Sequence, residues 1–147
     1  MRLIAFATVM LALPTIAAAD VDTILADAAK ACAAQDNGTL TTEGAVKEVD
    51  LTGDGKPDTV VDEAFFKCST SASLFNGGTG GSMVHFLADG SETARLVKGW
   101  DTANWAGSTL ILLALHGGEC GGAGVDPCFE ALTWGDNAFV SVRPKQN

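Results

Sequence analysis

The sequence has no tyrosine and few basic residues. Lysine and arginine number 9 against 18 aspartate and glutamate residues, which gives a formal net charge of −9. A chain this acidic is repelled by phosphate backbones and anionic lipid headgroups, so we expect no nucleic-acid partner. Beyond residue 19 the longest apolar stretch is Leu110–Leu115, far too short to span a bilayer.

The sequence also lacks a complete catalytic motif. The glycine-rich segment 76–82 has no lysine in the position that a phosphate-binding P-loop requires. His116-Gly117-Gly118 is similar to the oxyanion-hole segment of esterases, but no serine occurs in a Gly-x-Ser-x-Gly sequence. A hydrolase would therefore need an unrecognised site, for which the candidates are Asp62, Glu63, His85 and His116.

The first 19 residues are typical of a signal peptide. Arg2 precedes the apolar run Leu3–Leu13, and small residues at 17–19 precede Asp20, as signal-peptide cleavage requires. The remaining 128 residues, 147 minus 19, have the length of one domain, and no linker divides them. We therefore expect a single exported domain over 20–147, periplasmic or secreted, with no membrane insertion after cleavage.

The four cysteines are Cys32, Cys68, Cys120 and Cys128, and export favours disulfides over free thiols. Three pairings are possible, and spacing alone does not choose between them. Cys120 and Cys128 bracket a flexible glycine-rich loop whose ends can meet, so we pair those two and leave Cys32 with Cys68. A zinc site that uses cysteines with His116 is the alternative, but no Cys-x-x-Cys pair is present.

Apolar periodicity predicts one helix followed by strands. Val21, Ile24, Leu25, Ala28 and Cys32 have helical spacing after a cap at Asp20 or Asp22. Short β-rich runs then follow, separated by glycines: 45–49, 59–62, 83–87, 94–100, 109–116, 129–134 and 138–142. The expected fold class is α+β, with an N-terminal helix packed on a mainly antiparallel β-sheet or meander and held by disulfides. Because 109–115 is apolar on both faces, we expect it to be central, between layers or under the helix.

An acidic loop between two predicted strands has the ligand spacing of a calcium site. Asp50, Thr52, Asp54 and Asp58 place oxygen-bearing side chains at positions 1, 3, 5 and 9, and the Lys56 carbonyl is the natural backbone ligand. The loop resembles the calcium loops of FG-GAP and VCBS repeats, whose pattern is similar to D-x-[NDT]-G-D-G-x-x-D. That resemblance implies bound Ca²⁺, although a single copy excludes a propeller. An ordinary Asp/Gly hairpin turn is the alternative.

The region from Asp50 to Cys68, the glycine-rich turns and the segment 120–134 are similar to a group of small exported proteins from Gram-negative, mainly alphaproteobacterial, bacteria. The resemblance implies no activity. Members of that group often carry a further cysteine pair around the glycine loop, where this chain has Asn76 and Ser82.

Three functions remain open at this stage. The leading hypothesis is a noncatalytic, calcium-stabilised exported domain that binds an unknown protein or small ligand. The second is an inhibitor or immunity-like protein of an envelope enzyme, since negative charge steers association with basic targets. The third is a hydrolase with an unrecognised site. Trp105 lies in a predicted loop without apolar periodicity, so we expect it to be an exposed contact residue. Trp100 and Trp134 are expected to pack in the core, Trp100 on the same strand face as Leu96 and Lys98.

Overall fold

The computed structural model describes residues 20–142 of the chain. Helix α1 spans Val21–Ala33. The strands that follow are β1 (Leu40–Thr41), β2 (Val46–Val49), β3 (Asp58–Asp62), β4 (Lys67–Cys68), β5 (Ser82–Ala88), β6 (Ser91–Val97), β7 (Gly99–Trp105), β8 (Ser108–Leu115), β9 (Cys128–Gly135) and β10 (Ala138–Ser141). Three short 3₁₀ turns interrupt them: η1 (Glu63–Phe65), η2 (Gly78–Gly80) and η3 (Gly117–Cys120).

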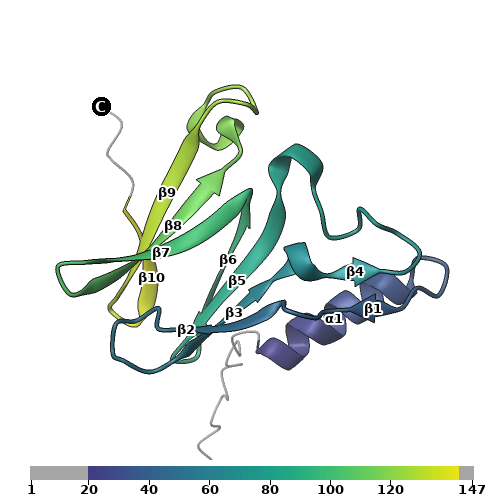
Figure 1. The fold of residues 1–147 in the computed structure, drawn as a ribbon, viewed down its shortest axis with the longest axis horizontal. Helices are drawn as coiled ribbons and strands as arrows, with labels where there is room; N and C mark the ends of the chain where they lie inside the picture. The colour runs from purple at the N-terminus through teal and green to yellow at the C-terminus, as the bar shows by residue number, and fades with distance from the viewer. Residues whose placement is uncertain (1–19, 143–147) are drawn as a thin grey trace, which may run out of the picture.

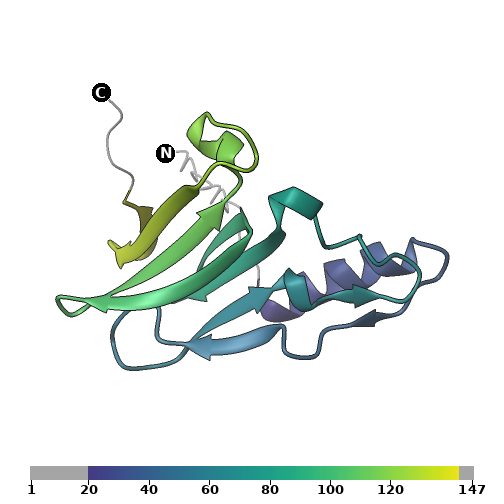
Figure 2. The same ribbon diagram turned by 45° about the horizontal axis from the view of Figure 1, so that its top comes forward.

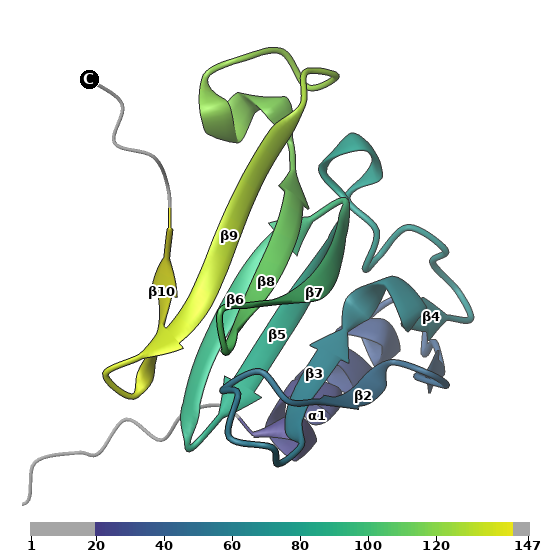
Figure 3. The same cartoon turned by 60° about the vertical axis from the view of Figure 1, so that its left-hand side comes forward.

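The strands form two four-stranded antiparallel sheets and a short ribbon. The order β2-β3-β5-β6 makes the first sheet, β10-β9-β8-β7 makes the second sheet, and β1 pairs with β4. Every neighbouring pair within these sheets is antiparallel, which agrees with the expected α+β class. Figures 1 and 3 show α1 and the second sheet on opposite sides of the first sheet.

A core fills the space between the two sheets. Val60 of β3 and Phe86 of β5 share it with Ile111 and Leu113 of β8 and Leu132 of β9. Each of these side chains is at most 1% exposed, so strand alternation points one face of each sheet at the other.

Helix α1 is the first element of the described residues, and a carboxylate cap begins it. The Asp20 side chain accepts a hydrogen bond from the Thr23 amide at 2.8 Å. Ile24 and Ala28 of the helix share a second buried cluster with Val61 of β3. Because Val60 lies in the core between the sheets, its neighbour Val61 faces the other way and contacts this second cluster.

Two disulfides join Cys32 to Cys68 and Cys120 to Cys128, the pairing that we preferred from the sequence. The first ties the last turn of α1 to β4, and the second closes the connection between β8 and β9. Among the described residues no cysteine is free, and no cysteine is left for a zinc site.

One predicted strand, 94–100, is wrong. The structure divides this segment at Lys98: β6 ends at Val97 and β7 begins at Gly99 in the other sheet. Trp100 therefore does not share a strand with Leu96. It lies in β7 and packs edge-on against Phe86, with ring centroids 5.5 Å apart. Val97 is buried in the core between the sheets, and the partly buried Trp100 packs against the same core. On one flat strand residues 97 and 100 would point to opposite faces, so both reach this core only because the chain changes sheets between them.

The predicted loop position of Trp105 is wrong, because Trp105 is the last residue of β7, but its predicted exposure is confirmed at 73%. A tight turn at Ala106 and Gly107, both with positive φ, then reverses the chain into β8. The proposed signal peptide, 1–19, lies outside the described residues. Within 20–142, no helix is long and apolar enough to cross a membrane.

Candidate functional site

The acidic loop between β2 and β3 folds around its own carboxylates. Asp50 Oδ1 accepts a hydrogen bond from the Gly53 amide at 2.7 Å, and its Oδ2 accepts one from the Gly55 amide at 3.0 Å. Both glycines have φ near +80°, a conformation that an L side chain rarely adopts. The glycines therefore let the loop close over Asp50.

The other two carboxylates also bind within the loop. Asp58 Oδ2 accepts hydrogen bonds from the amides of Leu51 and Thr52 at 2.8 and 3.0 Å. Asp54 Oδ1 accepts from the Lys56 amide at 2.8 Å, and its Oδ2 lies 3.1 Å from Lys56 Nζ. These hydrogen bonds and the lysine charge lower the pKa of Asp54. All three carboxylates are therefore hydrogen-bonded to amides of the loop itself.

Calcium fits this donor set in chemistry, because carboxylate, hydroxyl and carbonyl oxygens are the ligands that it prefers. An ionised carboxylate has about four lone-pair sites, so one or two amide hydrogen bonds leave it able to bind a cation. Within residues 20–142, however, no three His, Cys, Asp or Glu side chains are gathered so that they could hold a metal ion. The calcium ligands Asp50, Thr52, Asp54, Lys56 and Asp58 therefore stay a prediction.

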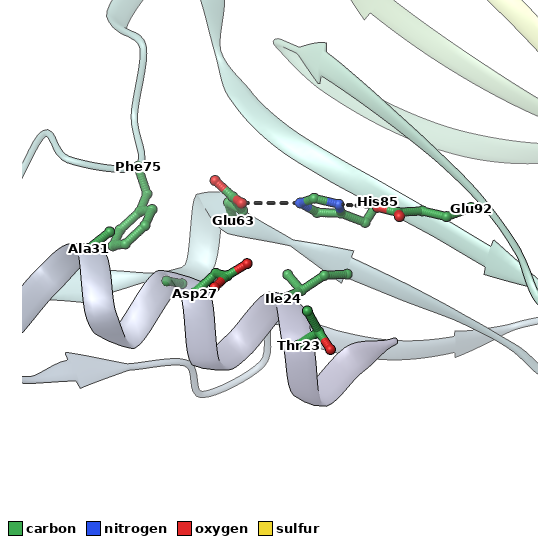
Figure 4. Close-up of a pocket in the computed structure, with 9 residues that line it drawn as sticks. Thr23, Ile24, Asp27, Ala31, Glu63, Phe75, His85 and Glu92 are labelled. Atoms are coloured by element: carbon green, nitrogen blue, oxygen red, sulfur yellow. Dashed lines mark hydrogen bonds and ion pairs between the residues drawn. The ribbon is translucent and has the colours of Figure 1, made fainter. Parts of the chain in front are cut away.

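A second cluster of polar side chains lines a cavity of about 330 Å³ between α1 and the first sheet. His85 of β5 lies between two glutamates there: its Nε2 is 3.1 Å from Glu63 Oε1, and its Nδ1 is 2.7 Å from Glu92 Oε1. Figure 4 shows the three side chains in a row above Ile24 and Asp27 of the helix. The side chain of His85 is only 13% exposed, so this contact is largely shielded from solvent.

The two glutamates determine the protonation of His85. Burial favours the neutral ring, but the hydrogen bonds and negative charges of Glu63 and Glu92 outweigh it and raise the pKa of His85. Both ring nitrogens thus have a carboxylate partner, and the raised pKa favours the protonated ring. A general base needs a free ring nitrogen, and both nitrogens of His85 are engaged in this arrangement.

The remaining hydrolase candidates lie apart from this cluster or have structural partners. Asp62 is buried, accepts a hydrogen bond from Trp100 Nε1 at 3.0 Å and lies 3.6 Å from Lys47 Nζ. His116 precedes η3, where its Nδ1 accepts from the Gly118 amide at 3.2 Å. The carboxylate of Asp62 thus joins the two sheets, and His116 caps a turn.

An apolar surface covers the side of the second sheet that points away from the first sheet. Ile111 and Leu113 of β8 point into the core, so the side chains between them point outward. The register brings the outward residues of neighbouring strands side by side: Leu112 lies between Asp101 and Ala131, and Leu110 lies between Ala103 and Thr133. We call this surface the outer face; its large apolar residues are Trp105, Leu110, Leu112, Phe129 and Val140.

The outer face is uncovered in the described residues. Trp105 is 73% exposed, Phe129 72% and Leu112 43%. The sequence prediction that β8 is central in its sheet is confirmed, but the prediction that layers cover both its faces is wrong. The outward side of β8 stays uncovered because the helix α1 packs on the first sheet, where Ile24 and Ala28 contact Val61.

Sequence reasoning missed the outer face and the pairing of His85 with Glu92. Alternating apolar residues in β8 did indicate two apolar faces, but not which of them would be covered. His85 and Glu92 are placed within hydrogen-bond distance by the β5–β6 hairpin, and Glu63 comes from η1, 22 residues before His85. An Asp89-Gly90 turn between two strands is the one signal that could have predicted that hairpin.

Comparison with known proteins adds no relative to this picture. No family model, no curated protein and no solved structure matches the chain. The functional argument therefore depends on the geometry of the chain itself.

Proposed function

We propose that residues 20–147 form a noncatalytic exported domain, periplasmic or secreted, that binds a partner protein through the outer face of its second sheet. The observation that carries this proposal is the exposure of Trp105, Leu112 and Phe129 on one side of one sheet. Large contiguous apolar surfaces are uncommon on monomeric soluble proteins and mark interaction sites.

The free energy that burial of the exposed apolar side chains would contribute supports a binding role. Burying a leucine or phenylalanine side chain contributes about 1.5 to 3 kcal/mol relative to leaving it in water. Burial of the exposed Trp105, Phe129 and Leu112 side chains by a partner would therefore contribute several kcal/mol to the binding free energy. The entropy lost on ordering and association reduces the net gain. Aromatic residues are also the side chains most enriched among binding hot spots.

The state of His85 supports a noncatalytic assignment. A carboxylate and a histidine do meet in one cavity, as a hydrolase would require, in Glu63 and His85. Glu92 occupies the second ring nitrogen, so no nitrogen remains to accept a proton from a nucleophile. The cluster instead links η1, β5 and β6 beneath α1. The hydrolase hypothesis therefore ranks below binding.

The calcium hypothesis belongs to the same proposal as a stabilising site. Asp50, Asp54 and Asp58 would supply carboxylates, Thr52 a hydroxyl and Lys56 a carbonyl, and a bound cation would neutralise part of the loop's negative charge. The oxygen chemistry of the loop and its two positive-φ glycines support the assignment. The likeness to small exported proteins of Gram-negative bacteria is consistent with the same compartment.

An inhibitor or immunity-like role is a special case of this function in which the partner is an envelope enzyme. The acidic composition, 18 acidic against 9 basic residues, favours a basic target. Small disulfide-bonded exported domains suit that use, and both disulfides are present here.

Affinity capture with matched variants tests the proposed function. The mature chain is compared with Leu112→Asp, which places a charge in the outer face, and with Leu96→Asp, a control of similar exposure on β6 of the first sheet (43% and 47%). We expect one envelope protein to be retained by the wild type and by Leu96→Asp, and lost with Leu112→Asp. A set of captured proteins that is the same for all three would overturn the proposal.

A further inference from the structure

We propose that the partner surface has an apolar centre surrounded by lysine and arginine side chains. This inference rests on the proposed function, because it describes what the outer face binds. It adds the chemistry of the partner, which exposure of apolar residues alone does not determine.

The charge distribution around the outer face carries the inference. From Gly99 to Val142, the segment that holds the whole second sheet, the sequence has no lysine or arginine. The same segment has five acidic residues: Asp101, Glu119, Asp126, Glu130 and Asp136. Four of them are exposed, while Glu130 is buried and contacts Arg95. Lys98 and Arg143 are the nearest basic residues on either side in the sequence.

The exposed acids lie beside the apolar residues or at the ends of their strands. Asp101 of β7 is directly opposite Leu112 on the outer face. Asp136 lies in the turn between β9 and β10, and Asp126 lies two residues before the strand that begins at Cys128 and carries Phe129. Glu119 and Asp126 belong to the β8–β9 connection and Asp136 to the β9–β10 turn, which are at opposite ends of β9, so the acidic groups are not confined to one corner. Figure 2 shows the β8–β9 connection, with η3, at the far end of the sheet from the β7–β8 hairpin.

One lysine reaches this sheet from outside the segment, because Lys98 Nζ donates a hydrogen bond to the Gly124 carbonyl oxygen in the β8–β9 connection at 2.6 Å. The acidic loop between β2 and β3 is not part of the border, since its Gly53 lies next to Thr109, which is buried on the core side of β8. The four exposed acids outnumber the single lysine, so the apolar residues of the outer face are bordered mainly by negative charge.

The negative charge around the outer face distinguishes between two possible binding partners, a second copy of the chain and a basic protein. A second copy of the chain would bring Asp101 and its neighbours against the same carboxylates, and like charges across an interface cost binding energy. A partner with lysines and arginines around an apolar centre would instead form ion pairs at the rim and bury Trp105 and Phe129 at the middle. The structure therefore favours a basic partner protein over self-association.

Two synthetic peptides of one length serve as probes. Both have the same apolar centre of leucine, phenylalanine and valine, flanked by lysines in one and by glutamates in the other. Binding to the mature chain is measured by fluorescence anisotropy of labelled peptide. We expect the lysine peptide to bind at least about tenfold more tightly, and the preference to shrink between about 50 and about 300 mM salt, because salt screens the rim charges.

Variants locate the effect on the outer face. Leu112→Asp should remove most binding of the lysine peptide, and Leu96→Asp should leave it unchanged. The double change Asp101→Asn and Asp136→Asn should reduce the preference for lysine, whereas Asp22→Asn with Asp27→Asn, two exposed acids of α1, should not.

The outcomes separate this inference from the proposed function. Equal binding of both peptides, abolished by Leu112→Asp, would overturn the charge inference and leave the proposed function intact. Absence of binding by either peptide would overturn the charge inference, while the proposed function is decided by the affinity capture. A dimer of the chain that dissociates on Leu112→Asp would identify a second copy as the occupant and would also overturn the inference.

Discussion

Arg95 of β6 and Glu130 of β9 meet across the interface between the two sheets, with Arg95 Nε 3.4 Å from Glu130 Oε2. The Glu130 side chain is almost fully buried, so its charge lies within the core that holds Val60 and Ile111. A buried carboxylate with a cation from the opposite sheet links the two sheets at one register. Arg95 also offers a positive charge to Glu130, the buried acidic residue of the second sheet. The other four acidic residues of the segment 99–142 are exposed.

Arg95→Met should therefore destabilise the fold. The change removes a charged donor from a buried carboxylate, and we expect a loss of about 1 to 3 kcal/mol in the free energy of unfolding. Chemical denaturation measures it, with Lys30→Met on the exposed side of α1 as control, expected to change stability by less than about 0.5 kcal/mol. Equal stability of Arg95→Met and wild type would show that the contact contributes nothing.

His85 predicts a pH dependence of stability. Its pKa in the folded protein is raised above the ordinary value of 6.5. Its ion pairs with Glu63 and Glu92 therefore stabilise the fold fully below about pH 6.5, and this contribution decreases as the pH rises through the raised pKa. The free energy of unfolding of wild type minus that of His85→Gln should fall as the pH rises above about 6.5. A difference that is constant or grows with pH would contradict the raised pKa of His85.

The calcium hypothesis predicts that thermal stability rises with free calcium. If calcium binds only the folded chain, the gain is about 2.7 kcal/mol at a hundredfold excess over Kd, and exported modules have Kd values of roughly 0.1 to 1 mM. Asp54→Ala removes a central ligand and keeps both loop glycines, so it should abolish the gain. Glu48→Ala on β2 serves as the control acidic residue. Identical melting of wild type and Asp54→Ala, with calcium and with chelator, would make the loop a plain hairpin turn.

The two disulfides predict the absence of free thiols and an order in which the two bridges contribute to stability. Nonreducing mass analysis of the mature chain should show no free thiol, because both bridges are closed. Replacing Cys32 and Cys68 by serine should cost about 3 to 4 kcal/mol, and replacing Cys120 and Cys128 about 2 to 3 kcal/mol, since the first bridge closes the longer loop. Sequence separations of 36 and 8 set that order, and the reverse order in denaturation would contradict it.

Much of the fold follows from local patterns in the sequence. Ile24, Ala28 and Cys32 have helical spacing, and all three are buried in α1. The turn at Asn137, with positive φ, lies between two apolar runs that pair as β9 and β10. Such signals extend over only a few residues, which is why the helix and most strands could be predicted.

The candidate site could not be predicted in the same way. Lys98 looks like a strand residue between Val97 and Trp100, but the chain changes sheets there, and only the three-dimensional core requires it. The outer face depends on where α1 lies, because a helix over the second sheet would have covered Leu112. Periodicity identifies apolar faces, whereas the tertiary arrangement decides which of them stays exposed.

Site-specific photocrosslinking tests the outer face most directly. A photoreactive residue replaces Leu112 in one chain and Leu96 in another, and each chain is irradiated in the cells that produce it. The account predicts a discrete protein adduct from position 112, weakened when Asp101→Asn and Asp136→Asn are added, and no such adduct from position 96. The same adducts from both positions, or an adduct from position 96 alone, would show that the outer face of the second sheet is not the binding surface.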